Sequence, residues 1–297
     1  MDRHRARHTE DTMASNPAFN RLEKDAQSGY AGFQGDGARA NPGNNVSYAQ
    51  QGAAHSMNPQ QLQDMYNAPT AGPTDTGRVT MDDVIMKTMG LFALVLGFGA
   101  VGWIVASQNQ QLGFMLLMGG MIGTLVLGLV IAFKKTLSVP LIVGYAVLEG
   151  LFVGAVSQVF EKLYDGVVPM AAMATVGVFV GMFLAYKSGL IKVTDKFRRI
   201  VTMMIFGYAI FAVINFIFAM VTNTPFGIGG NGMFGIAISV FAVGLASVSL
   251  ALDFDMIERA IATGAPQKYS WLLAHGLIVT VVWLYIEFLR LFARMRD

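Results

Sequence analysis

The stretch GMFGIAISVFAVGLASVSLALDFDM, residues 232–256, is apolar over most of its length and contains two aspartates near its end. A helix needs roughly 20 apolar residues to cross the hydrocarbon core of a bilayer, so this stretch predicts a membrane span. A carboxylate within such a span costs about 2.5–3.5 kcal/mol on insertion scales, which makes it a candidate functional residue. Asp253 and Asp255 are therefore the first residues that need an explanation.

Six further stretches have the same character. The predicted spans are residues 88–107, 112–133, 138–160, 168–187, 199–222, 232–256 and 271–292. Glycines recur inside them, and small residues let helices approach closely in lipid, so the pattern favours a packed bundle. Because the spans show no alternation of period two, the pattern argues against a β-barrel. The predicted fold is an all-α membrane protein with seven transmembrane helices.

The chain is 54% hydrophobic and 13% charged, but its first part is very different. Residues 1–80 are rich in Gly, Asn, Gln, Ala, Ser and Thr and cannot bury enough apolar surface to offset the entropy of ordering. We expect a disordered cytoplasmic tail over 1–80 and a transmembrane domain over 81–297. No signal peptide is expected, and Met13 is an alternative start to Met1.

Several classes of function are disfavoured by composition and motifs. A net charge of +2 is too small to imply nucleic-acid binding, and the absence of cysteine excludes disulfides and thiolate sites. The sequence has no HExxH, Walker A or GxSxG motif. No GxGD motif accompanies a membrane acid, which disfavours an intramembrane aspartyl protease. We expect no enzymatic activity and no cofactor.

Lysines and arginines predict the orientation, since they accumulate on the cytoplasmic side. With the N-terminus inside, the segments on the inner side hold eleven of these residues and those on the outer side hold four. The outer four are Lys162, Arg290, Arg294 and Arg296. Three of them follow Glu287, so the last helix either spans fully or re-enters; seven full spans are preferred. The prediction is a multi-pass protein of the cell membrane with its N-terminus in the cytoplasm.

Two more acids lie within spans. Glu149 is midway through the third span, in LIVGYAVLEGLFVG, and Glu287 lies in VVWLYIEFLRLF. If carboxyls converge inside the bundle, their mutual repulsion lets the site hold a proton near neutral pH. The simpler alternative leaves Asp253, Asp255 and Glu258 solvated at the interface and pairs Glu287 with Arg290 or Arg294. Asp253 and Glu258 fit this alternative better, whereas Glu287 and Asp255 favour function.

The ordered motifs GYAVLEGLFVGAVS, LDFDMIERA, GAPQKYSW and VVWLYIEFLRLF resemble the bacterial branch of the Bax inhibitor-1 family. SNPAF and TMDDVIMKT add to the likeness, which covers roughly residues 78–297. The resemblance implies seven helices with the last one near the centre, and a proton-sensitive calcium leak gated by two acids. By their motifs, those acids fall on Asp255 in FDMI and Glu287 in LYIEF. The longer segment between them puts a direct pairing in doubt.

The leading hypothesis is thus a pH-sensitive cation leak, for which calcium is the expected ion. Asp255, Glu287 and Glu149 are its predicted proton-sensing residues, with transient Ca²⁺ at Asp255 and Glu287. Asp253, Glu258 and His275 are secondary candidates; a lone helical histidine is more often a packed or pore-lining residue. The alternative is a non-transporting regulator that binds a membrane protease or another membrane protein. A proton-coupled transporter of small solutes also stays open.

Overall fold

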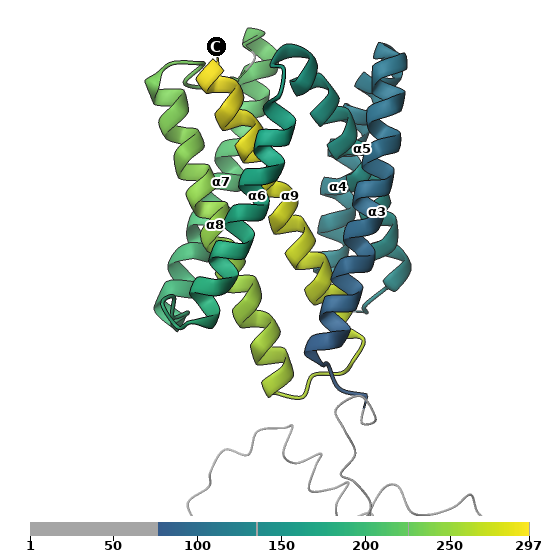
Figure 1. The fold of residues 1–297 in the computed structure, drawn as a ribbon, viewed down its shortest axis with the longest axis vertical. Coiled ribbons are helices and arrows are strands. Elements are labelled where there is room, and N and C mark those ends of the chain that lie inside the picture. The colour runs from purple at the N-terminus through teal and green to yellow at the C-terminus, as the bar shows by residue number, and fades with distance from the viewer. Residues whose placement is uncertain (1–76, 135, 225, 297) are drawn as a thin grey trace, which may run out of the picture. The chain divides into compact units, whose positions relative to one another are not determined.

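The computed structural model describes residues 77–134, 136–224 and 226–296, and these form seven helices (Figure 1). They are α3 (Met81–Gln108), α4 (Gln110–Phe133), α5 (Val139–Leu163), α6 (Val167–Lys187), α7 (Asp195–Thr222), α8 (Met233–Ala262) and α9 (Tyr269–Arg296). Each is long and apolar enough to cross a membrane. The described segments contain no strand, only an isolated bridge between Arg78 and Pro266. The predicted all-α fold with seven spans, the last one included, is confirmed.

The helices α3 and α8 extend furthest past one end of their predicted spans, because polar residues occupy these extensions. α3 begins at Met81, where the Thr80 side chain accepts a hydrogen bond from the Asp83 backbone N–H as an N-cap. α8 continues through MIERAIA to Ala262, and Gly264 follows just beyond the helix with a φ of +65°, which favours glycine. The extension of α8 places Asp253 and Asp255 well inside the helix. Most of the predicted tail lies outside the described residues.

α9 is the most deeply buried helix. Within its most apolar window 56% of residues are buried, against 6% for α7. It packs against α3, α5, α6 and α8, and it crosses the middle of the view in Figure 1. The central position implied by the family resemblance is therefore present. α7, in contrast, packs mainly along α8.

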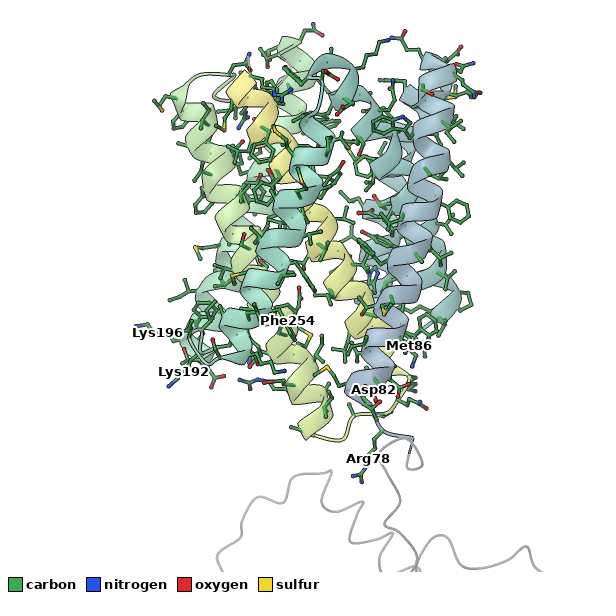
Figure 2. All side chains as sticks on the ribbon, viewed as in Figure 1. Arg78, Asp82, Met86, Lys192, Lys196 and Phe254 are labelled. Atoms are coloured by element: carbon green, nitrogen blue, oxygen red, sulfur yellow. The ribbon has the colours of Figure 1, made fainter. Side chains whose placement is uncertain are left out.

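Several basic residues lie at one end of the bundle. We call the end with the start of α3 and the α4–α5, α6–α7 and α8–α9 turns the N-terminal end, and the other the C-terminal end. Figure 2 shows Arg78, Lys192 and Lys196 together at the N-terminal end. This is the end that the distribution of basic residues predicts to face the cytoplasm.

The segment before α3 is tied to the α8–α9 turn. The Val79 N–H donates to the Ala265 carbonyl over 2.8 Å, and the Gln267 N–H donates to the Gly77 carbonyl over 2.7 Å. The Gln267 side-chain amide donates to both carboxylate oxygens of Asp83, at 3.1 and 3.0 Å. The sequence motifs TMDDVIMKT and GAPQKYSW are therefore in contact, and this contact holds the start of α9 in place.

Candidate functional site

Glu287 lies inside the bundle on α9 and is 2% exposed. Its Oε1 accepts a hydrogen bond from the Tyr208 hydroxyl of α7 at 2.7 Å and one from the Trp283 indole N–H at 3.1 Å. Arg290, one turn along α9, forms an ion pair with the same oxygen at 3.4 Å. The pairing of Glu287 with Arg290, which the simpler alternative predicts, is present, and Tyr208 adds a link to a second helix.

Asp255 faces the α7 side of α8 near the N-terminal end of the bundle and is 9% exposed. Its Oδ2 lies 2.5 Å from an Arg198 guanidinium nitrogen of α7 and 2.9 Å from Nε of Arg259, one turn along α8. Two arginines therefore share one carboxylate oxygen. The pair with Arg198 crosses between helices, while the pair with Arg259 stays within α8.

Asp255 and Glu287 have separate partners and lie at different depths. Asp255 is seven residues before the end of α8, and Glu287 is eighteen residues after the start of α9. At 1.5 Å per residue these offsets are roughly 10 and 27 Å from the shared α8–α9 turn. The hypothesis that these acids converge as a like-charge pair is wrong, because the antiparallel helices place them at different levels.

Glu149 forms a third, separate environment on α5 and is 6% exposed. Its nearest polar neighbours are the side chains of Tyr145, one turn earlier, and Thr124 of α4. The Tyr145 ring meets the His275 ring of α9 edge to face, with centroids 4.5 Å apart. Glu149 therefore does not join Asp255 or Glu287 but lies beside a Tyr–His pair at the centre of the bundle.

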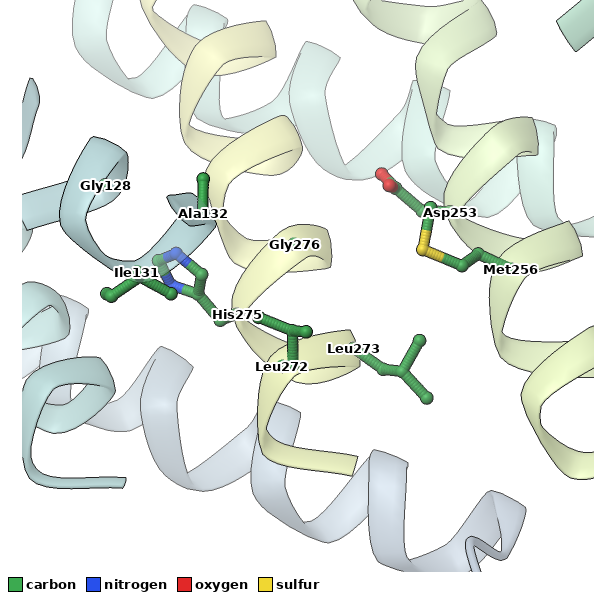
Figure 3. Close-up of a pocket in the computed structure, with 9 residues that line it drawn as sticks. All are labelled: Gly128, Ile131, Ala132, Asp253, Met256, Leu272, Leu273, His275 and Gly276. Atoms are coloured by element: carbon green, nitrogen blue, oxygen red, sulfur yellow. The ribbon is translucent and has the colours of Figure 1, made fainter. Parts of the chain in front are cut away.

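Asp253 was expected to lie solvated at the interface, and this expectation is wrong. Its Oδ2 is buried and accepts no hydrogen bond from any described residue. The side chain lines a cavity of about 200 Å³ between α4, α8 and α9, which His275 and Gly276 also line. Figure 3 shows the carboxylate pointing from α8 toward α9. The continuation of α8 beyond Asp255 explains the difference, since it moves Asp253 away from the helix end.

Glu258 and Asp255 take different roles despite their proximity. Glu258 is exposed and accepts a hydrogen bond of 2.6 Å from the Tyr186 hydroxyl of α6. This is the interfacial position that the sequence favours for Glu258.

A metal chelate is not present among these acids. In the described residues no three His, Asp or Glu side chains come together as a set of metal ligands. A Ca²⁺ ion takes six to eight oxygen ligands, so an ion at Asp255 or Glu287 would depend on backbone carbonyls and water.

Comparison with known families agrees with the motifs. The family model described as Bax inhibitor 1 like matches residues 16–297, nearly the whole chain. The chain belongs to the Bax inhibitor 1 like family. No curated protein matched the sequence. The family match begins before the described residues, at Asn16, and so includes all of the SNPAF motif except its first residue.

For this family member, the sequence did not reveal the partners of its acids. Arg198 is one of several basic residues in KFRR, and nothing in that run indicates which of them reaches Asp255. Tyr208 lies in an apolar span with no neighbouring charge. An unpaired carboxylate in lipid is costly, so the sequence indicates that each acid has a donor on a facing helix. It does not indicate which residue that donor is.

The basic residues near the end of α9 also have structural partners. Arg294 is buried and donates to the Gly235 carbonyl and Ser239 hydroxyl of α8, at 2.5 and 2.7 Å, and to the Phe226 carbonyl at 3.2 Å. Arg296 donates to the Asp165 carbonyl. A basic C-terminal end is therefore compatible with seven full spans, since these two arginines donate hydrogen bonds to backbone carbonyls of neighbouring segments.

Proposed function

We propose that this protein is a pH-sensitive cation leak, for Ca²⁺, in which α7 acts as the gate. We infer that the N-terminal end faces the cytoplasm of a bacterial inner membrane. The activity is transport and not catalysis. The observation that carries the proposal is that Asp255 and Glu287 each bind α7 to the rest of the bundle, through Arg198 and Tyr208.

The apolar packing of α7 is sparse enough for such a role. Only Val201 and Tyr208 of this helix are buried, and a cavity of about 490 Å³ lies between α7 and α8. Tyr208 lines this cavity, and its hydroxyl donates a hydrogen bond to Glu287. Weakly packed elements are those that open at low free-energy cost. The polar links to the two acids therefore contribute a large share of what holds α7 in place.

Protonation would weaken the link at Asp255 directly. A neutral Asp255 no longer attracts Arg198, and Arg198 and Arg259 then face each other without a carboxylate between them. Glu287, when neutral, would lose its attraction to Arg290 and accept less strongly from Tyr208. Acid would therefore release α7 and open a path along the α7–α8 cavity. In this scheme each acid holds α7 through its own cationic or hydroxyl partner, and the two acids do not contact each other.

The test is Ca²⁺ influx into dye-loaded liposomes that contain the full-length protein, measured from pH 8 down to pH 4. Asp255→Asn imitates the protonated residue, so we expect severalfold higher flux at neutral pH and a flatter pH profile; Glu287→Gln should act in the same direction. Asp195→Asn is the matched control, because Asp195 pairs with the same Arg198 at 3.7 Å but its side chain is 91% exposed. It should behave as the wild type.

Two results would overturn the proposal. One is a flux and pH profile that neither substitution changes. The other is wild-type protein that conducts no more than empty liposomes. The second result would favour the regulator hypothesis, whose predicted binding segment, residues 1–75, lies outside the described residues. That hypothesis would then be tested by deleting those residues and following a captured membrane partner.

A further inference from the structure

The four membrane acids divide into two classes by counter-charge. Asp255 and Glu287 have arginine partners, at 2.5 and 3.4 Å. Asp253 and Glu149 form no ion pair with any described residue. A carboxylate buried in lipid without a counter-charge is costly, so each of these two requires a proton or a cation from elsewhere. Asp253 adjoins a cavity that could admit such a cation.

The cavity beside Asp253 has apolar walls. Ile131 and Ala132 of α4, Met256 of α8 and Leu272 and Leu273 of α9 form most of its lining, with Asp253 and His275 as the polar members (Figure 3). Small-molecule sites have this composition: mainly apolar walls with one or two polar groups that fix orientation. Thr280 of α9 lies within hydrogen-bond reach of the Asp253 carboxyl, but Oδ2 of Asp253 is buried and accepts no hydrogen bond from the described residues, so this oxygen lacks a donor.

The cavity opens on the side of the bundle. Met256 is 57% exposed and Leu272 is 37% exposed, and both line it. Asp253 is nine residues from the end of α8, which places it roughly 13 Å along the helix from the N-terminal end. Ile131 and Ala132 lie in the last turn of α4 and Leu272 lies in the first turn of α9, so the opening is near the boundary between the headgroups and the acyl chains. A ligand that arrives from there needs an apolar body.

We propose that the cavity between α4, α8 and α9 binds a small organic ammonium ion, with its charge on the Asp253 carboxylate and its apolar part against Ile131 and Leu272. The ammonium group donates hydrogen bonds to the unpartnered oxygen and supplies the missing counter-charge. A bare metal ion fits less well, because the described residues gather no third His, Asp or Glu ligand there. This site does not depend on the α7 gate.

Cysteine labelling can test the site, since the chain contains no native cysteine. A Cβ at Gly276 meets open space, so Gly276→Cys places a thiol in the cavity without a clash. The full-length variant in nanodiscs is treated with a cationic methanethiosulfonate, the ethyltrimethylammonium reagent, or an anionic one, the sulfonatoethyl reagent. For each reagent, the labelling rate of Gly276→Cys is divided by that of Gln108→Cys, which corrects for the intrinsic reactivity of the reagent. Gln108 is an exposed residue at the C-terminal end of α3. Ala274→Cys, fully buried on α9 and outside the cavity, should stay unreactive.

We expect the cationic reagent to be preferred at Gly276→Cys, and Asp253→Asn to reduce that preference about tenfold. Butylammonium should slow the labelling, and Ca²⁺ or K⁺ at equal ionic strength should not. An unreactive Gly276→Cys, or a charge preference that Asp253→Asn leaves unchanged, would overturn the site. Protection by Ca²⁺ and not by butylammonium would overturn the ligand class. None of these measurements uses flux. The ammonium site can therefore be disproved without affecting the proposed cation leak, and the leak can be disproved without affecting the site.

Discussion

Arg198 of α7 and Asp255 of α8 form an ion pair of 2.5 Å between two helices, of which α7 buries only Val201 and Tyr208. The same carboxylate oxygen also binds Arg259 within α8. Removing Arg198 therefore breaks the link between the helices without leaving Asp255 unpaired. This separation allows the gate to be tested without creating a buried uncompensated charge.

Arg198→Gln should lower the stability of the bundle modestly and raise the leak. Because the Arg198 side chain is 36% exposed, we expect a loss of about 1 kcal/mol or less. The measurements are thermal unfolding in detergent and Ca²⁺ flux at neutral pH. Arg199→Gln is the control, since Arg199 is exposed and forms no ion pair with a described residue. Equal behaviour of the two variants would argue against the α7 link.

Tyr208→Phe removes the hydroxyl that donates to Glu287 and keeps the ring that packs against Trp283, whose centroid lies 5.7 Å away. Loss of one hydrogen bond to a buried carboxylate should cost about 1–3 kcal/mol. The flux profile should shift in the same direction as in Glu287→Gln. Tyr285→Phe is a matched control on α9, because its hydroxyl bonds Ser157 at 2.7 Å and does not touch Glu287. Only Tyr208→Phe should change the pH dependence.

The spans could be predicted because a run of apolar residues is a local signal that needs no knowledge of the partners. The start of α3 could not, since Asp82, Asp83 and Lys87 interrupt the hydropathy of a segment that Thr80 caps as a helix. The family motifs identified Asp255 and Glu287 as the acids of interest. Their environments followed from the structure alone.

The difference between Asp253 and Asp255 shows where prediction stops. Residues at i and i+2 point in different directions on a helix, as expected, so the two acids face different neighbours. Asp255 meets Arg198 of α7, and Asp253 points toward α9. Which acid would be paired depends on how α8 is rotated and how far it extends. Neither property can be read from the composition of the span.

Gln267→Glu should destabilise the protein more than Gln267→Ala. The Gln267 amide donates to both oxygens of Asp83, so a glutamate there would place two carboxylates together next to Lys87. Alanine removes the hydrogen bonds but adds no repulsion, and should cost about 1 kcal/mol. Thermal unfolding of both variants measures the difference. The destabilisation by Gln267→Glu should diminish at low pH, where one carboxyl takes up a proton; a pH-independent loss would contradict the contact.

Gly154→Ala should be among the most destabilising small substitutions in the bundle. A Cβ at Gly154 of α5 would overlap the backbone of Gly99 and Trp103 in α3, so the two helices would have to separate. Small residues at helix contacts in lipid permit this close approach, and overpacking typically costs about 1–3 kcal/mol. Gly97→Ala on α3 is the matched control, because a Cβ there meets no atom within 4 Å. Since alanine favours helix over glycine by about 1 kcal/mol, the control should be neutral or slightly stabilising. A similar unfolding midpoint for both variants would show that α3 and α5 do not pack through their glycines.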